Sequence, residues 1–280
     1  MNRRGFIDYV ARNSTENSGK TKSYDTAILI LDNVLKFQNR INLRGKSLYE
    51  ITDESVLEEV LKLVKEEVVK MKAGKPNIFD HGNPNQKSYP LNSFCSAALK
   101  NLLEYNQLEK DVVEANIIVK GEKDPQVISK KLLNYFDITK EGEDKIYKSK
   151  HRKGQEYFRR MILANYGGRC ALTGIDIPQV LLASHIIPWS DAEHHSERLN
   201  PSNGICLSAL YDKAFDEGLI TFSPDDYSVC MSSLLCDNES KDYYDHHFGC
   251  IVGKKLTIPE VFKPNRDFLA YHRDKVFVGL

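Results

Sequence analysis

The sequence predicts an α+β protein with a helical N-terminal domain and a C-terminal domain of short strands and a helix. Two patterns support this class: apolar residues recur at helical spacing between residues 25 and 105, whereas residues 180–222 contain short apolar runs between turn residues. A chain of 280 residues is long enough for two domains of roughly 150 residues each. The predicted limits are a helical domain over 1–120, a linker over 121–150 and the second domain over 151–280.

Three helices are predicted in the first domain. The clearest begins at Thr52 and Asp53, which can cap it, and ends at Gly74 and Pro76. Its apolar stripe consists of Leu57, Val60, Leu61, Val64, Val68 and Met71. The other two helices cover about 25–38 and 92–105, and each has one apolar face. Three such helices bury their faces against one another; the alternative is that they pack directly on the rest of the chain as one domain.

The linker is polar, is interrupted by Gly121, Pro125 and Gly142, and contains one predicted short helix near 129–136. Charge then separates along the chain. Residues 145–169 hold eight basic residues and one acid, and residues 212–245 hold nine acids and two lysines. A basic run of this kind is most often a solvated face, and alternatively a surface for nucleic acid.

The composition excludes several classes of protein. The 39 basic and 39 acidic side chains balance, which argues against a polybasic nucleic-acid coat. No apolar run has the length of a signal peptide or a membrane span, so we expect a cytoplasmic protein. The six cysteines include no Cys-x2-Cys pair, so no structural zinc is expected. Cys230, Cys236 and Cys250 lie close together and are interpreted as ordinary thiols, with a metal or disulfide role as the alternative.

Short segments follow one another in a defined order after residue 180. Val180–Ile187 is an apolar run suited to a strand, and it contains His185. After a loop rich in proline and polar residues, Gly204–Leu207 is predicted as a second strand. Ser208–Glu217 fits a helix that Gly218 stops, with another short strand after it. The sequence therefore predicts a strand, a loop, a strand and a helix.

Several motifs in this region share their order and spacing with one nuclease family. They are Cys170-Ala171-Leu172-Thr173-Gly174, Ala183-Ser184-His185-Ile186-Ile187-Pro188-Trp189, Asn200-Pro201-Ser202-Asn203-Gly204 and Tyr211-Asp212-Lys213-Ala214-Phe215-Asp216-Glu217-Gly218, with Tyr271-His272-Arg273 near the C-terminus. The stretch over about 155–277 resembles the HNH nuclease family, whose catalytic unit is a ββα-metal finger. It also resembles one branch of the family that is common among restriction and phage-defence nucleases.

The resemblance implies a role for each key residue. The family pattern is a His on the first strand, an Asn at the start of the second, and a His or carboxylate nine residues later; here these are His185, Asn203 and Asp212. A neutral imidazole can take a proton from water at physiological pH, so His185 is the predicted general base. Asp212 offers the oxygen ligand that Mg²⁺ or Mn²⁺ prefers, and Ser184 is the second predicted ligand. Asn203 would hold the loop and the base in position.

Neighbouring residues leave alternatives open. Tyr211 occupies a position where members of the branch often carry His, so a degenerate, inactive finger is the alternative to an active one. Asp216 is interpreted as a structural residue at the helix end, and Trp189 as a packing residue. Asp80 and His81 are interpreted as part of a turn, because Gly82-Asn83-Pro84 follows them.

The resemblance also gives the basic run a function. Phe158, Met161, Ile162 and Tyr166 form a buried helical face, which should leave basic side chains free to meet phosphates. The predicted DNA-binding residues are Lys153, Arg159, Arg160 and Arg169. The expected partner is double-stranded DNA, and a homodimer is expected because one finger makes one nick. The alternatives are a DNA-binding or interaction module with an inactive finger, and an RNA-cutting toxin.

Overall fold

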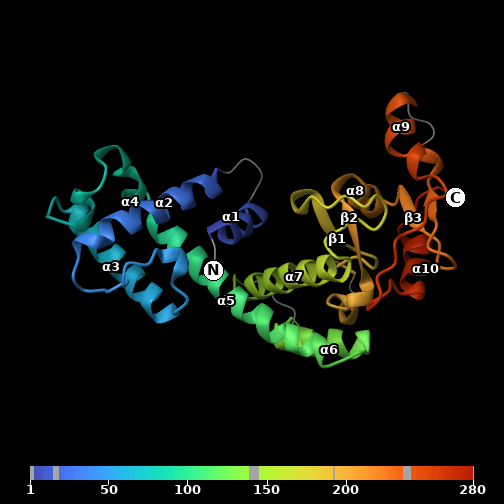
Figure 1. The fold of residues 1–280 in the computed structure, drawn as a ribbon, viewed down its shortest axis with the longest axis horizontal. Helices are drawn as coiled ribbons and strands as arrows, with labels where there is room; N and C mark the ends of the chain where they lie inside the picture. The colour runs from blue at the N-terminus through green and yellow to red at the C-terminus, as the bar shows by residue number, and fades with distance from the viewer. Residues whose placement is uncertain (1–2, 15–18, 139–144, 192, 236–240, 280) are drawn as a thin grey trace. The chain divides into compact units, whose positions relative to one another are not determined.

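A computed structural model describes residues 3–14, 19–138, 145–191, 193–235 and 241–279, without the side chains of 145–149 and 241 (Figure 1). It divides into two compact units, Met1–Val113 and Glu114–Leu280. The predicted order is confirmed: a helical region over residues 3–165 is followed by a region that mixes strands and helices. Among the described residues, no helix has an apolar stretch long enough to cross a membrane.

The first unit consists of helices around one apolar core. Its helices are α1 (Arg3–Arg12), α2 (Lys20–Val34), α3 (Glu54–Lys72), α4 (Ser88–Leu91) and the first part of α5 (Phe94–Lys120). Asp53 begins α3, because its side chain accepts a hydrogen bond from the backbone N–H of Ser55 at 3.0 Å. The buried stripe of α3 includes Leu57, Val60 and Val64, as the helical spacing predicts.

The segment predicted as a linker is largely helical. It contains α6 (Pro125–Tyr135), which Asp124 caps, and the first residues of α7 (Lys145–Asn165). Because α5 runs on to Lys120, the boundary between the two compact units falls inside that helix. The domain limits 1–120, 121–150 and 151–280 remain predictions.

The second unit is organised around a small antiparallel sheet. Strands β1 (Leu181–His185) and β2 (Gly204–Ser208) pair so that His185 lies opposite Gly204. Helices α7 and α8 (Ala209–Asp216) pack on this pair. A Cβ atom on Gly204 would lie 2.5 Å from Cδ1 of Ile162, so glycine at this position lets α7 approach the sheet.

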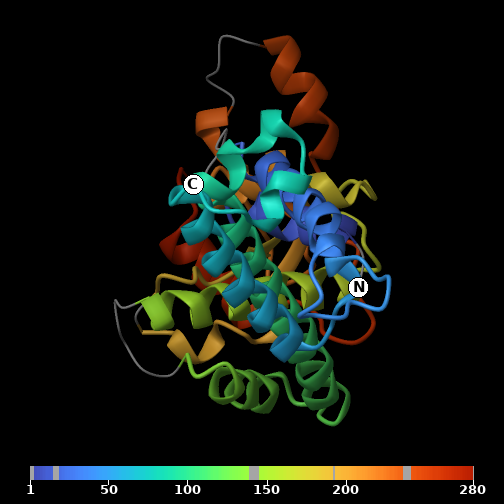
Figure 2. The ribbon, with the colours of Figure 1, turned by 90° about the vertical axis from the view of Figure 1, so that its left-hand side faces the viewer.

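The remaining elements of the second unit follow α8 along the chain. Strands β3 (Ile220–Phe222) and β4 (Val229–Met231) form a second antiparallel pair, and α10 (Arg266–Lys275) packs on β3. Gly218, between α8 and β3, has a φ of 67°, and a Cβ atom there would lie 2.1 Å from the carbonyl oxygen of Val276. Helix α9 (Lys241–His247) projects away from the sheets, as the turned view in Figure 2 also shows.

Candidate active site

An open cleft of about 430 Å³ lies where β1, α8 and α10 meet. The side chains that line it include two carboxylates, two imidazoles and a hydroxyl. They are Ser184, His185, Asp212, Asp216 and His272, together with Leu182, Ala183, Pro188, Trp189 and Val276. Three predicted site residues therefore face the same cleft: Ser184 and His185 from β1, and Asp212 from α8.

His185 is held between two aromatic rings. Its imidazole stacks on Phe158 of α7, with 3.8 Å between ring centroids, and meets Trp189 edge to face at 5.4 Å. Its Nε2 lies 3.0 Å from the carbonyl oxygen of Arg198. A carbonyl oxygen only accepts hydrogen bonds, so Nε2 carries the proton. In the neutral ring, the lone pair is then on Nδ1, which is the arrangement a general base requires.

Burial lowers the pKa of His185 to about 4, although the hydrogen bond to the backbone of Arg198 raises it. The positive charge of the Arg198 side chain lowers the pKa further. The imidazole is therefore neutral at physiological pH. An anionic phosphate bound beside the ring would raise this pKa, because a nearby negative charge favours the protonated form.

Arg198 lies in the loop between β1 and β2 and binds Trp189 near the start of that loop. Its Nε donates to the carbonyl oxygen of Trp189 at 2.9 Å, and its guanidinium lies over the Trp189 ring, 5.5 Å from the centroid. Trp189 therefore contacts both His185 and Arg198. Its predicted packing role agrees with these contacts, and it also lines the cleft.

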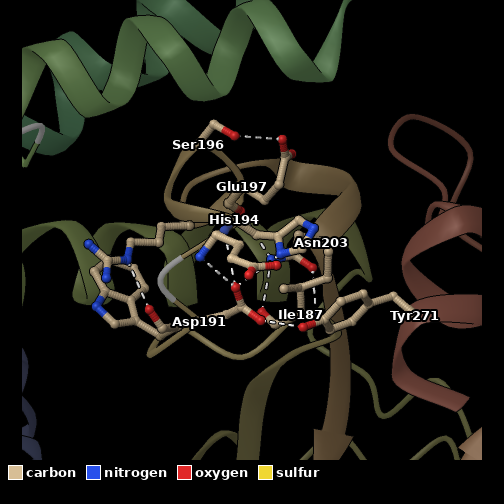
Figure 3. A network of polar contacts seen from close by, with 10 residues as sticks. Ile187, Asp191, His194, Ser196, Glu197, Asn203 and Tyr271 are labelled. Carbon is tan, nitrogen blue, oxygen red and sulfur yellow. Dashed lines mark hydrogen bonds and ion pairs between the residues drawn. The ribbon is translucent and has the colours of Figure 1, made fainter. Parts of the chain in front are cut away.

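Asn203 joins the two ends of the loop between β1 and β2 (Figure 3). Its Oδ1 accepts from the backbone N–H of Ile187 at 2.8 Å, and its Nδ2 donates to the carbonyl oxygens of Ile187 at 3.2 Å and Glu197 at 3.0 Å. The side chain is buried, with 1% of its surface exposed, and it does not line the cleft. These contacts fit the predicted positioning role and give Asn203 no direct part in chemistry.

The same loop is held from α10 and α6. Asp191 accepts hydrogen bonds from Tyr271 Oη and, at 3.0 Å, from Nδ1 of His194, and Figure 3 shows it between these two side chains. The bonds from Tyr271 and His194 lower the pKa of Asp191 to about 2. From α6, Ser129 Oγ donates to the carbonyl oxygen of Ser196 at 2.5 Å. The loop therefore has contacts with two helices besides its own strands.

Asp212 and Ser184 meet directly. Ser184 Oγ donates to Oδ1 of Asp212 at 2.6 Å. Burial raises the pKa of Asp212, and the bond from Ser184 opposes this shift. Asp216 lies one turn further along α8 and also faces the cleft. Its pKa rises to about 6, first through burial and then through the negative charge of Asp212.

These residues fit a divalent cation. The two carboxylates face one cleft, and the negative charge of Asp212 raises the pKa of Asp216, so a bound cation would stabilise both charges. Mg²⁺ takes one or two carboxylates and keeps several waters. Asp212, Asp216 and the hydroxyl of Ser184 would hold it. The interpretation of Asp216 as purely structural is therefore incomplete. Its spacing of four residues from Asp212 on a predicted helix was the signal in the sequence that could have placed both on one face.

The comparison with protein families agrees with this geometry. Residues 170–223 match the model of the HNH endonuclease family, and they include β1, β2, α8 and the residues just described. The chain contains an HNH endonuclease domain. Such a domain implies a nucleic-acid substrate, and nucleases of this family typically use a divalent metal ion. No curated protein matches the chain.

Tyr211 points away from the cleft of the HNH domain. Its Oη donates to the carbonyl oxygen of His247 at 2.5 Å, and its ring lies edge to face with Phe248. On a helix, consecutive side chains are about 100° apart, which explains why Asp212 faces the cleft and its neighbour does not. The roles of His185, Asn203, Asp212 and Ser184 in catalysis and metal binding remain predictions.

His272 is a residue of the cleft to which the sequence assigned no role. It is 1% exposed, and it stacks on Phe215 with 3.8 Å between ring centroids. Its Nε2 donates to the carbonyl oxygen of Phe215 at 3.2 Å, so Nδ1 accepts from Thr221 Oγ1 at 2.9 Å. Burial lowers its pKa to about 4. Both ring nitrogens are engaged, so His272 joins α10 to the HNH domain rather than serving as a second base.

The basic side chains before the HNH domain are less free than the sequence predicted. Arg159 Nη2 donates to the carbonyl oxygens of Pro178 at 3.1 Å and Leu181 at 2.8 Å, where β1 begins. Arg160 forms an ion pair with the buried Glu156 at 3.3 Å. Each of these two arginines therefore has a partner within the second unit, and their contact with DNA phosphates remains a prediction.

Lys153 and Arg169 are the other two predicted DNA-binding residues. Lys153 lies on α7 and is partly buried. Arg169 follows α7, and its side chain is 61% exposed and paired with the exposed Asp176 at 2.9 Å. Exposed ion pairs of this kind stabilise a protein by at most about 1 kcal/mol, so the guanidinium of Arg169 can exchange Asp176 for a phosphate.

Proposed function

We propose that this protein is a divalent-metal-dependent endonuclease that hydrolyses phosphodiester bonds of double-stranded DNA in restriction or phage defence. The observation that carries the proposal is the position of His185, whose bond to Arg198 leaves Nδ1 as the basic nitrogen, in the same cleft as Asp212. The restriction or phage-defence setting rests on the resemblance of the HNH domain to that branch.

His185 would accept a proton on Nδ1 from the water that attacks phosphorus, and the P–O bond to the leaving oxygen would break. A divalent ion, when bound, neutralises charge on the scissile phosphate and on the leaving oxygen. Asp212 and Asp216 would hold that ion, with Ser184 orienting the Asp212 carboxylate through its 2.6 Å bond. Asn203 would keep the base in position through the loop.

Contacts with the DNA backbone are proposed for Lys153 and Arg169. Replacing both with Glu should weaken binding to all sequences about equally, because phosphate contacts carry no direct sequence information. It should also flatten the dependence of log affinity on log salt concentration. An unchanged slope would remove both residues from the proposed interface.

A plasmid-nicking assay tests the proposed activity. Wild-type protein should convert supercoiled plasmid to the nicked form with Mg²⁺ or Mn²⁺ and should not do so in EDTA. His185→Ala should be inactive, whereas His246→Ala should match the wild type, since His246 is exposed on α9 and outside the cleft. Preferential degradation of structured RNA would indicate the RNA-cutting toxin instead.

One observation favours a second function, a DNA-binding module whose HNH domain is inactive. Within the described residues, no group of three His, Cys, Asp or Glu side chains could hold a metal ion, so a metal in the cleft would depend on two carboxylates, Ser184 and water. A protein that shifts DNA in a gel but never nicks it with Mg²⁺ or Mn²⁺ would support this function. Two copies are needed to cut both strands, so we also propose a homodimer, which light scattering of the protein on DNA would detect.

A further inference from the structure

A cleft of about 330 Å³ lies in the helical first unit and is not used by the proposed nuclease. Its walls come from the end of α2, the following turn at Leu35–Phe37, and the turns at Ile78–His81 and Pro84–Gln86. Its volume falls at the lower end of the range of ligand-binding pockets, about 300–1,000 Å³.

An exposed pair of stacked rings forms one wall of this cleft. Phe37 lies on His81, with 4.6 Å between ring centroids and 13° between ring planes. The side chain of Phe37 is 57% exposed, so much of its ring surface is open to solvent. Its stack on His81 holds the ring in one orientation. An aromatic face held in this way can stack a further planar ring.

The polar groups of the cleft suit a nucleotide. The lining includes Lys36 and the carboxamides of Asn33 and Gln86, which can donate to and accept from base edges. The oxygen of Asn83 already accepts from the backbone N–H of Asn85 at 3.0 Å, which leaves its Nδ2 as a donor. None of the side chains that line the cleft is acidic. A shallower hollow that shares part of the same wall adds Lys87. The positive charges of Lys36 and Lys87, near the Phe37 ring, complement the negative charge of a phosphate.

Asp32 is the carboxylate on α2 whose charge interacts with Lys36. It is turned inward, where it accepts hydrogen bonds from Ser47 Oγ at 2.5 Å and from the backbone N–H of Leu48 at 2.8 Å.

The floor of the cleft is tightly packed, since a Cβ atom on Gly82 would lie 3.1 Å from Cγ1 of Val34. The cleft therefore exists before any ligand binds.

We propose that this cleft binds a nucleotide, with an unpaired base stacked on Phe37 and its phosphate beside Lys36. The chemistry fits a base of single-stranded DNA or a free nucleotide. This proposal rests on the proposed nuclease function in one respect: a nuclease would bring nucleic acid to the cleft. Nucleotide binding itself requires neither cleavage nor a metal ion.

Binding of fluorescein-labelled (dT)12 to the full chain in EDTA, followed by anisotropy, tests the proposal. Phe37→Ala should weaken binding by about 5- to 150-fold, the factor that corresponds to a base–aromatic stack of about 1–3 kcal/mol. Val69→Ala is the matched control, because Val69 is 67% exposed on α3 of the same unit and away from the cleft. Lys36→Glu should also weaken binding.

Phe37→Trp gives a second readout that does not depend on loss of function. It should keep the affinity for (dT)12, and the base should quench the added tryptophan fluorescence. If dAMP alone quenches this signal and displaces (dT)12, the source is a free nucleotide; if only the oligonucleotide does so, the source is a DNA strand. If Phe37→Ala binds (dT)12 within twofold of Val69→Ala, and neither ligand quenches Phe37→Trp, the cleft is not a nucleotide site.

The nicking assay on the same preparations separates this proposal from the proposed nuclease function. Quenching of Phe37→Trp by a protein that never nicks plasmid would support the cleft and contradict the nuclease. If the protein nicks plasmid, but Phe37→Ala does not change (dT)12 binding and Phe37→Trp is not quenched, the nuclease function is supported and the nucleotide cleft is contradicted.

Discussion

Replacing Asn203 with Ala would remove the side chain that joins the two ends of the loop between β1 and β2. In the folded protein this side chain is 1% exposed and makes three hydrogen bonds to backbone groups of Ile187 and Glu197, at 2.8, 3.2 and 3.0 Å. Alanine leaves all three backbone groups without this partner in a buried place. Ile187 is two residues after His185, so the loosened segment includes the backbone that carries the base.

The magnitude follows from the number of bonds. Each hydrogen bond contributes about 1 kcal/mol net, so Asn203→Ala should lower the free energy of unfolding by about 3 kcal/mol. For a protein of this size, 1 kcal/mol corresponds to about 2–4 °C in Tm, which gives a decrease of about 6–12 °C. Asn203→Asp should be worse at neutral pH, because it would put a charged oxygen opposite two carbonyl oxygens.

Thermal unfolding followed by circular dichroism measures the decrease, and the nicking assay at a temperature below the transition measures its effect on cleavage. Asn134→Ala is the control, since Asn134 is exposed on α6 in the same unit. An Asn203→Ala protein that melts within 2 °C of this control and nicks at the wild-type rate would refute the assignment of Asn203 as the residue that holds the loop.

Three further predictions concern the cleft. His185→Ala should abolish nicking while DNA affinity stays within about twofold, because losing a general base removes chemistry and not phosphate contacts; more than a few per cent of wild-type turnover would contradict its role. In calorimetric titrations with Mn²⁺, Asp212→Asn should lose at least tenfold in affinity. Tyr211→Phe should keep its affinity and lose only about 1 kcal/mol of stability with its hydrogen bond; the opposite result would indicate a degenerate finger. Stability should also fall as pH decreases from about 6.5 towards 4, because His272 and His185 each have a pKa of about 4 when folded and the unfolded chain binds their protons first. His272 contributes at most about 3 kcal/mol to this loss of stability. The Tm of His272→Gln should therefore decrease less than that of the wild type between pH 7.5 and 5. An equal decrease would show that His272 does not cause the loss.

The sequence predicted the local parts of the site because their signals are local. His185 and Asp212 were assigned from the resemblance of one strand–strand–helix segment to the HNH pattern, and the structure places both in one cleft. The partner of His185 could not be predicted in this way. Arg198 lies in the loop, and its carbonyl reaches the imidazole only through the path the backbone takes between the strands. His272 was missed for a similar reason, since α10 joins the site from far along the chain.

The helical unit shows where a regular pattern fails as a guide. The predicted helix over 92–105 is part of α5, which continues to Lys120. Beyond residue 105 its apolar residues no longer share one buried face: Leu108 and Ala115 are buried, whereas Val113 is 59% exposed. A helix with exposed apolar residues has a weak period, so its end could not be read from the spacing.

The hydrogen bond that fixes the protonated nitrogen of His185 has a consequence for mutational tolerance. Its acceptor is a peptide carbonyl, which every amino acid possesses, so no substitution at position 198 deletes the acceptor itself. The ring's protonation pattern is therefore encoded by the length and path of the segment between the strands and not by one side chain. In a comprehensive mutational scan, insertions or deletions between residues 190 and 199 should inactivate the protein more uniformly than exchanges at position 198.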